Sequence, residues 1–452
     1  MKETNKTMPT DLESESPLLL NSNSSQSYRT KMKYPALILA CLLSIGAYFC
    51  YDNPASLESH LTDPNGTFKL DHVSYSLLYS VYAFPNTILP LFGGFLVDKM
   101  GVRIGLLFFS LLLTIGQLLI FLGGISTTFS LLLVGRVLFG IGSESLNVTQ
   151  TTIIAHWFEG SGISFAIGLN IAIARIGSVM NSALTPILYN VNEGYFLPLF
   201  IGLLLCVGSF LCGLVLCYVD KKAEIQEKQK SQEESEKIQL SDLKSFSLLF
   251  WFLLLTCILT YGSFYTFNAN ANDILNKRFH ISNEIAGLYL MVVFLIAALV
   301  TPLFGMFFDR YGRRSYGLLL ALSLLISALL MVAFFPSDIM SSLTLVPLVC
   351  LGVFYPTFAA VFWPCIPRVV EKKTLGSAYG LLMSFQNLGI AVSPLIFAAI
   401  QNSSFNNDQY FNPLVYLIFQ ALIALYVGVL VNITDFRRGS KLDLPAIKLE
   451  KH

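Results

Sequence analysis

Residues 94–103 read GFLVDKMGVR, and residues 305–314 read GMFFDRYGRR. The two stretches share the order glycine, aspartate, basic residue, glycine and basic residue, and they begin 211 positions apart. Short cytosolic loops of membrane proteins are rich in Lys and Arg, which accounts for the basic residues but not for the shared Gly and Asp. We therefore expect an internal repeat, in which two related halves make up the chain.

A second pair of stretches repeats at almost the same interval. Residues 168–182 read GLNIAIARIGSVMNS and align with residues 380–394, GLLMSFQNLGIAVSP, at an offset of 212. The alignment places Gly177 on Gly389, but it places Arg175 on Asn387. The repeat therefore predicts a symmetric scaffold that carries a positive charge in one half only.

The composition is that of an integral membrane protein. Of the 452 residues 54% are hydrophobic and 13% are charged, and the mean hydropathy is +0.64. About 20 helical residues cross a bilayer core, and lipid offers backbone groups no partners, so each span must be a helix. We expect an all-α membrane protein of two six-helix bundles, with spans near residues 34–52, 73–97, 104–124, 128–152, 163–189, 194–219, 247–268, 284–308, 315–335, 341–364, 376–400 and 410–434.

The positive charges predict the orientation. Placing the N-terminus in the cytosol puts all but five of the 29 Lys and Arg on the cytosolic side, as the positive-inside rule requires. The net charge of +1 gives no indication of nucleic-acid binding. We expect both termini in the cytosol and five segments: a tail over 1–33, a bundle over 34–219, a linker over 220–246, a bundle over 247–435 and a tail over 436–452.

Nothing in the sequence indicates an enzyme, a metal site or a cofactor. The five His residues are scattered outside the span centres, and no His, Cys, Ser and acid cluster lies on either face. The eight Cys lie in or beside apolar spans without a CxxC pair, so we interpret them as small membrane residues.

Two six-helix halves that each carry G-x-x-x-D-[RK]-x-G between the second and third helices resemble the major facilitator superfamily. The resemblance extends from about Lys33 to Arg438. It implies that the halves pack about a pseudo-two-fold axis, bind substrate near the midplane and rock to give alternating access. It also implies a structural or conformational role for the motif residues Gly94, Asp98, Arg103, Arg136, Gly305, Asp309, Arg310 and Arg313.

Glu144 and Arg175 are charges inside predicted spans. Glu144 is the one carboxylate well inside a span, because Asp52 is expected at a helix end. Counting 1.5 Å per residue from the turn near 155–162 puts Glu144 and Arg175 at similar depths, so they can face one cavity. They either form a salt bridge that packs the helical hairpin or bind a zwitterion, with arginine taking a carboxylate and glutamate an ammonium.

A closer resemblance supports the zwitterion. YFCYDNPASL (48–57), LLYSVYAFPN (77–86), GSESLNVTQ (142–150), IARIGS (173–178), and LGSAYG with FQNLG (375–389) resemble the lysosomal dipeptide uniporters of that superfamily. The resemblance implies that Glu144 receives the peptide amino group and Arg175 the carboxylate. It also implies contributions from Tyr79, Tyr82, Trp363 and Asn387. FNANAN (267–272) and a segment one residue shorter between Trp363 and Leu375 depart from the family pattern.

The N-terminal tail carries a sorting pattern. Within DLESESPLLL, residues Glu15, Leu19 and Leu20 fit the acidic dileucine signal that cytosolic adaptors read, so we expect residence in the lysosomal membrane. Asn65 and Asn402 are the glycosylation sequons expected on the lumenal side. The resemblance implies a heavily glycosylated single-span accessory subunit as a partner, beside dipeptide and membrane lipid.

Two other functions fit the same residues. One is a proton-coupled carrier of amino acids or organic anions, although a single intramembrane carboxylate favours uniport. The other is a nutrient sensor or scaffold that binds peptide without moving it.

Overall fold

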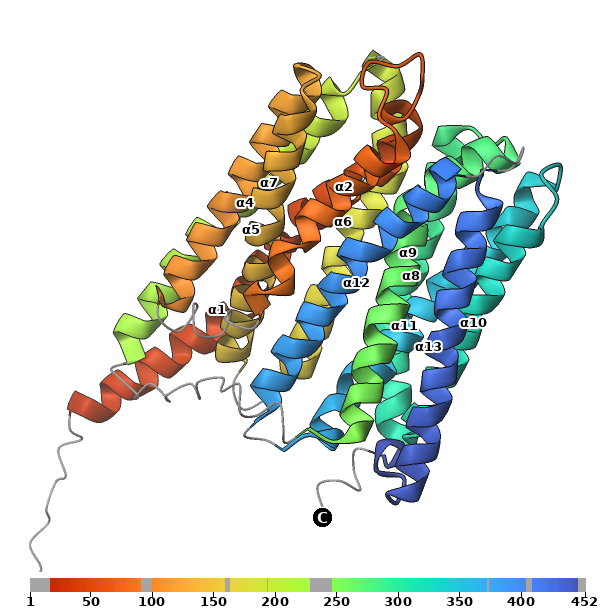
Figure 1. The fold of residues 1–452 in the computed structure, drawn as a ribbon. Coiled ribbons are helices and arrows are strands. Elements are labelled where there is room, and N and C mark those ends of the chain that lie inside the picture. Colours follow the sequence, from red (N-terminus) through yellow and green to blue (C-terminus); the bar gives the residue numbers. More distant parts are fainter. Residues whose placement is uncertain are drawn as a thin grey trace, which may run out of the picture.

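The structure is a computed structural model that describes residues 17–90, 100–158, 163–192, 194–227, 246–371, 374–403 and 409–445. These residues form long helices and short 3-10 turns (Figure 1). The elements are α1 (Pro17–Leu61), α2 (His72–Ala83), η1 (Pro85–Thr87), α4 (Val102–Ile125), α5 (Phe129–Trp157), α6 (Ile163–Asn192), α7 (Phe196–Glu227), α8 (Leu248–Phe279), α9 (Asn283–Tyr311), α10 (Arg314–Phe334), η3 (Ser341–Thr344), α11 (Leu345–Val369), α12 (Leu375–Ser403), α13 (Phe411–Arg437) and η5 (Lys441–Asp443).

The helices form two bundles that pair their members in the same way. In the first half α1 packs against α6 and α7, and α4 packs against α5 and α7. In the second half α8 packs against α12 and α13, and α10 packs against α11 and α13. The two bundles lie side by side in Figure 1 and meet where α2 packs on α12, α6 on α9 and α1 on α8. This is the repeated two-bundle architecture that the sequence predicted.

Equivalent glycines make the same contact in both halves. A Cβ atom on Gly177 of α6 would clash with the carbonyl oxygen of Ile45 in α1, and one on Gly389 of α12 would clash with that of Ile258 in α8. These helix pairs can approach closely because the position has no side chain, as is common in membrane helix packing. The repeat alignment of Gly177 with Gly389 therefore corresponds to a shared packing contact.

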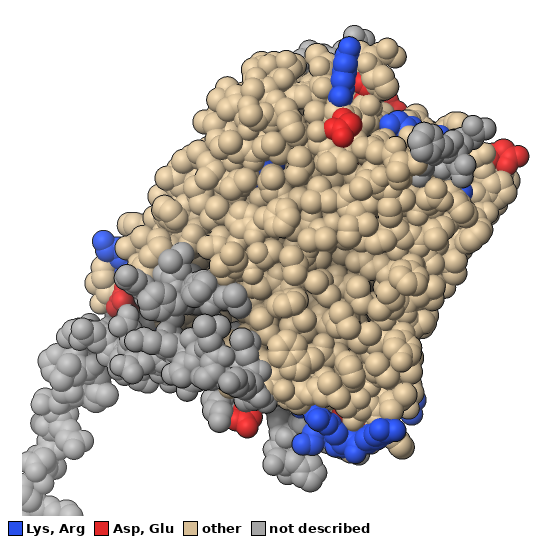
Figure 2. Space-filling model, viewed as in Figure 1, with Lys and Arg blue, Asp and Glu red and all other residues tan. Residues whose placement is uncertain are grey.

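An apolar belt surrounds both bundles. Figure 2 shows a broad surface almost without charged residues between two charged ends, and many exposed side chains on the helices are Leu, Ile, Val and Phe. Eleven helices of the described part are long and apolar enough to cross a membrane. For the remaining predicted span, 73–97, the structure describes α2 and η1, while 91–99 lie outside the described residues.

Helices α1 and α8 extend well beyond their predicted spans. We expected spans over 34–52 and 247–268, whereas the helices continue to Leu61 and Phe279. Helix α1 passes through Pro54, which has no N–H to donate to the carbonyl of Cys50. Arg136 supplies the missing hydrogen bond at 3.3 Å. The expectation that Asp52 lies at a helix end was therefore wrong.

Hydrogen bonds join the halves toward one end of the bundle. We call this the loop end, because it carries residues 62–71 and 280–282; the terminal end carries the start of α1 and η5. Toward the loop end the Tyr75 hydroxyl donates to the Ala269 carbonyl at 2.6 Å, and the Ser80 hydroxyl donates to the Ala391 carbonyl at 2.6 Å. The structure is thus closed at its loop end.

Candidate functional site

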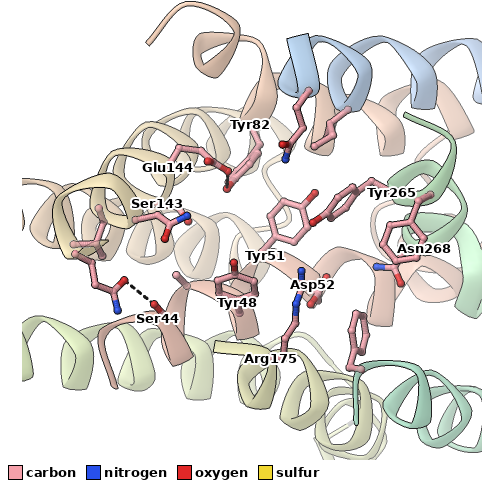
Figure 3. Close-up of a pocket in the computed structure, with 18 residues that line it drawn as sticks. Ser44, Tyr48, Tyr51, Asp52, Tyr82, Ser143, Glu144, Arg175, Tyr265 and Asn268 are labelled. Carbon is pink, nitrogen blue, oxygen red and sulfur yellow. Dashed lines mark hydrogen bonds between the residues drawn. The ribbon is translucent and has the colours of Figure 1, made fainter. Parts of the chain in front are cut away.

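A polar cavity lies between the two halves at the middle of the helices. It holds about 760 Å³ of space, including the part that opens to solvent. Figure 3 shows its side chains converging from α1, α5, α6 and α8. Its lining comprises Ser44, Ala47, Tyr48, Tyr51, Asp52, Tyr82, Ser143, Glu144, Leu146, Asn147, Gln150, Arg175, Phe264, Tyr265, Asn268, Phe294, Gln386 and Ile390.

Arg175 is buried in the cavity wall, and one of its hydrogen-bond donors has no partner among the described residues. Its guanidinium carbon lies 4.3 Å from the centre of the Tyr355 ring and 5.2 Å from that of Tyr48. Its Nη2 donates to the hydroxyl of Tyr355 in α11. Its Nε is buried and has no hydrogen-bond partner in the described part of the chain. A buried donor without a partner is costly, so this site favours a ligand that accepts a hydrogen bond.

Glu144 lines the same cavity without contacting Arg175. One of its carboxylate oxygens accepts a hydrogen bond from the Tyr82 hydroxyl at 3.0 Å. Among the hydrogen bonds and ion pairs of the described residues, none joins Glu144 to Arg175. The salt bridge that would only pack the hairpin is therefore not formed, and the two opposite charges face one space (Figure 3).

Asp52 is the main residue that sequence reasoning missed. It is 5% exposed, lines the cavity and lies near Arg175 in Figure 3. The turn residues DPNG at 63–66 were the available signal, because they follow the end of α1, which lies nine residues later than expected. Tyr265 and Asn268 of α8 also line the cavity, and only the crossing of the helices reveals which of their faces points inward.

Of the four other residues expected in the site, one lines the cavity. Tyr82 is in the lining, whereas Tyr79, Trp363 and Asn387 are not. Tyr79 packs edge-on against Tyr51. Trp363 donates to the Tyr261 hydroxyl at 3.0 Å, and the Asn387 amide donates to the Met383 carbonyl at 3.0 Å. The residues of α12 that do line the cavity are Gln386 and Ile390.

The two arginines of the first-half motifs both bind other groups of the first bundle. Arg136 is 1% exposed and donates to the backbone carbonyls of Leu78, Cys50 and Tyr51 at 3.1 to 3.3 Å. Arg103 forms an ion pair with Asp220 of α7 at 2.5 Å. Both contacts stay within the first bundle.

In the second half, Asp309 forms an ion pair with Arg314 at 2.5 Å, while Arg310 and Arg313 are exposed. A Cβ on Gly305 would meet nothing within 4 Å. The equivalent Gly94 and Asp98 lie outside the described residues, so the structure gives the contacts of the motif aspartate in the second half only.

The predicted sorting and glycosylation residues lie away from the cavity. Glu15 is outside the described residues, and Leu19 and Leu20 lie in the first turns of α1, where only the backbone is described. Asn65 is exposed in the loop between α1 and α2. Asn402 is exposed at the loop end of α12.

Comparison with known proteins places the chain in a family. The model of the Major Facilitator Superfamily matches residues 37–394 and, in a second match, 252–439. The lysosomal dipeptide transporter MFSD1 of Homo sapiens is 34% identical over 92% of this chain and 89% of its own length. That of Gallus gallus is 30% identical over 92% of this chain and 88% of its own.

A solved structure of the nucleoside transporter NupG matches with a TM-score of 0.72 at 15% identity, over 88% of this chain and 99% of that one. At this identity the match supports the fold alone. With two repeated bundles, a polar cavity between them and these sequence matches, the chain belongs to the major facilitator superfamily of membrane transporters and is similar to proteins named lysosomal dipeptide transporters.

Proposed function

We propose that this protein exports dipeptides from the lysosomal lumen to the cytosol as a uniporter. The observation that carries the proposal is the pair of separate charges in one cavity: Arg175 has an unpartnered Nε, and Glu144 is not paired with it. A zwitterion that spans the cavity satisfies both. The relatives at 30–34% identity are named dipeptide transporters, which supports a peptide over other zwitterions.

In this proposal each end of the peptide meets its own charge. The planar guanidinium of Arg175 takes the carboxylate through two parallel hydrogen bonds, and the carboxylate of Glu144 takes the ammonium. Tyr82, which already donates to Glu144, fixes the orientation of that carboxylate. The two charges of the peptide then compensate the charges of Arg175 and Glu144 inside the cavity.

The second half contributes uncharged side chains to the wall of the cavity. Phe264, Tyr265, Asn268 and Phe294 line its side of the cavity. Flat aromatic and amide groups contact side chains of many shapes, so we expect broad acceptance of dipeptide side chains. The main-chain ends, which every dipeptide shares, bind to the first half.

Transport proceeds by alternating access in this proposal. The cavity lies at the interface of two repeated bundles, where rocking of one bundle against the other opens one side and closes the other. The motif loops around Asp98 and Asp309 form contacts that differ between the two states. Since no ion is carried along, the peptide gradient sets the direction.

The environment of the protein follows from the same proposal. Both termini face the cytosol, adaptors bind the dileucine signal of the N-terminal tail, and Asn65 carries a glycan in the lumen. A heavily glycosylated accessory subunit protects the sparsely glycosylated lumenal face.

A proton-coupled carrier is the second candidate, and Asp52 favours it, because proton-driven carriers use intramembrane carboxylates. Purified protein in vesicles tests both. Uniport predicts saturable uptake of a labelled dipeptide with no proton movement on a trapped pH dye. Uptake in fixed proportion to protons would establish the carrier instead, and binding without uptake would establish a sensor.

A further inference from the structure

A second cluster of buried charges lies between the halves, nearer the loop end than the cavity. We call it the acidic seam: Glu58 and Ser59 of α1, Thr62 just after α1, Asp273 and Lys277 of α8, and Tyr410 before α13. It lies on the turns of α1 and α8 that extend beyond the predicted spans. It is separate from the cavity, since none of its residues is in the cavity lining.

Asp273 is completely buried and well satisfied. One carboxylate oxygen accepts from the Ser59 hydroxyl at 2.9 Å. The other accepts from the Tyr410 hydroxyl and lies 3.0 Å from the Lys277 ammonium, which also donates to the Thr62 hydroxyl at 3.2 Å. Asp273 therefore joins α8 to α1 across the interface.

Glu58 has no such partners. It is 0% exposed, and neither of its carboxylate oxygens has a hydrogen-bond partner among the described residues. The backbone N–H of Asp273 is nearby but does not meet the geometry of a hydrogen bond. Ser59, the residue next to Glu58, donates to Asp273, and Glu58 interacts electrostatically with both Asp273 and the Lys277 ammonium. A buried carboxylate without donors and next to a like charge is strongly disfavoured as an anion.

Other titratable groups also surround the seam. His60 of α1 interacts electrostatically with the seam. So do three residues of α2, which are His72, Tyr75 and Tyr79. The phenol of Tyr410 interacts with the two carboxylates from the start of α13. The groups around Glu58 are thus Asp273, Lys277, His60, His72, Tyr75, Tyr79 and Tyr410, of which the two imidazoles are the competing proton acceptors in mildly acidic solution.

We propose that Glu58 and Asp273 form a proton-binding site between the two halves. The site takes up one proton when the halves close at the loop end and releases it to the same side when they part. Closure removes water from Glu58 and brings it against Asp273, so the closed state needs the proton. Opening hydrates both carboxylates, and Glu58 then ionises.

Because the closed state binds this proton, acid on the loop side favours closure of the loop end. In the proposed orientation the loop end faces the acidic lumen, so lumenal acid promotes the step that turns a loaded cavity toward the cytosol. The proton returns to the side from which it came, and no proton is carried across. The inference rests on the alternating access of the proposed function, but not on the identity of the peptide.

Spin labels across the loop end test the inference. Exposed Asn65 and Met340 lie on different halves and can each be replaced by Cys for labelling, after replacement of the two less buried cysteines, Cys212 and Cys350, by Ser. Distance distributions are then measured in nanodiscs without peptide, over about pH 5 to 7.5. Because one proton is bound on closure, we expect the ratio of short to long distances to rise by up to about tenfold per pH unit of acidification.

Three variants locate the proton. Glu58→Gln is neutral at every pH, so we expect short distances throughout and no pH dependence. Glu284→Gln is the matched control, because Glu284 also joins the halves at this end by accepting from Asn190 but is partly exposed; it should keep the wild-type pH dependence. His60→Gln with His72→Gln should keep it as well.

Three results would overturn the inference. They are an unchanged distance distribution across the pH range, a pH dependence that persists in Glu58→Gln, or one that disappears with the two histidines. The labels report closure without peptide. A failure here therefore leaves dipeptide uptake by the wild type as a separate question, and a failure of dipeptide uptake leaves this measurement unaffected.

Discussion

At the scale of residues, the two buried arginines show how a structural charge differs from a binding charge. All three guanidinium nitrogens of Arg136 donate to backbone carbonyls, and the side chain is 1% exposed and outside the cavity lining. Arg175 is held by two tyrosine rings and one hydroxyl, and its Nε is left without a partner. Because buried polar groups in proteins are nearly always satisfied, the unsatisfied arginine is the one that binds substrate in our proposal.

The position of Asp52 leads to a prediction about the empty cavity. Asp52 lines the cavity beside Arg175, and we expect its carboxylate to offset the charge of Arg175 when no peptide is bound, so Asp52→Asn should destabilise the peptide-free protein by about 1–2 kcal/mol. A peptide carboxylate then replaces the lost charge. In thermal unfolding with and without a saturating dipeptide, we expect a larger peptide-induced rise in Tm for the variant than for the wild type.

Glu144→Gln is the control for this measurement. It neutralises a carboxylate of the same cavity that accepts from Tyr82 and is not paired with Arg175. It should reduce the peptide-induced rise instead of increasing it. Equal rises in the wild type and Asp52→Asn would show that Asp52 does not balance Arg175.

The sequence could reveal some residues of the site and not others, for a physical reason. Glu144 and Arg175 could be predicted because a charge inside an apolar span is conspicuous wherever it points. Tyr265 and Tyr355 are aromatic residues in apolar helices, where packing is their usual role. Only the crossing of α8 and α11 with the first bundle brings them near Arg175.

At the scale of elements, a proline lies just beyond the expected end of the first span. A proline inside a helix leaves a carbonyl without its donor, and Pro54 lies inside α1. Here the donor is Arg136, more than 80 positions away in the chain. A contact of such separation cannot be predicted from the local pattern, and it keeps α1 helical through Asp52 and Glu58.

The repeated glycines predict a matched pair of packing defects. Gly177→Ala and Gly389→Ala each place a Cβ against a backbone carbonyl of the neighbouring helix, so each should destabilise the protein by about 1–3 kcal/mol. Gly168→Ala in the same helix as Gly177 meets nothing within 4 Å. We expect it to leave thermal stability in detergent unchanged or slightly raised. A loss of stability in Gly168→Ala as large as in Gly177→Ala would contradict this packing role.

The motif loops lead to a prediction about exchange between states. Asp309 is paired with Arg314 at the terminal end of the second half, and Asp98 occupies the equivalent position of the first repeat. If Asp98 makes such a contact in one access state only, its energy differs between the states. Asp98→Ala should then slow dipeptide exchange across vesicles while dipeptide affinity stays within about twofold of the wild type.

Exposed Asp338 at the loop end supplies the control, since Asp338→Ala should change neither exchange nor affinity. Loss of dipeptide binding in Asp98→Ala with normal exchange would assign Asp98 to the substrate site instead.

At the scale of the whole molecule, the repeat predicted the architecture and its asymmetry. Two copies of one loop motif at a fixed interval indicate two equivalent bundles, and the helix pairs of the structure repeat in that way. The replacement of Arg175 by Asn387 in the second copy indicated that binding charge lies in one bundle. The acidic seam could not be predicted, because α1 and α8 meet there only after the bundles have docked.

The N-terminal tail carries a prediction about location. Leu19→Ala with Leu20→Ala removes the two side chains that an adaptor would bind, so we expect the protein to accumulate at the cell surface. The substituted residues lie far from the bundle cores, so thermal stability and dipeptide uptake of the purified protein should stay unchanged. Microscopy that finds the double variant still in lysosomes would show that another segment carries the sorting signal.

The central claim is that Arg175 and Glu144 bind the two ends of a dipeptide, and uptake of end-blocked peptides into vesicles tests it most directly. Wild type should carry a dipeptide and reject its N-acetylated and C-amidated forms. Arg175→Lys should lose about 30-fold or more of the dipeptide uptake, or about 2 kcal/mol, because an ammonium cannot reproduce the planar two-donor fork of the guanidinium.

In the same assay Glu144→Gln should discriminate less between the free and the N-acetylated peptide, because the lost contact is the one to the ammonium. Full uptake of both blocked peptides by the wild type, or recovery of uptake when Arg175→Ala and Glu144→Ala are combined, would contradict the claim and assign these charges to the scaffold.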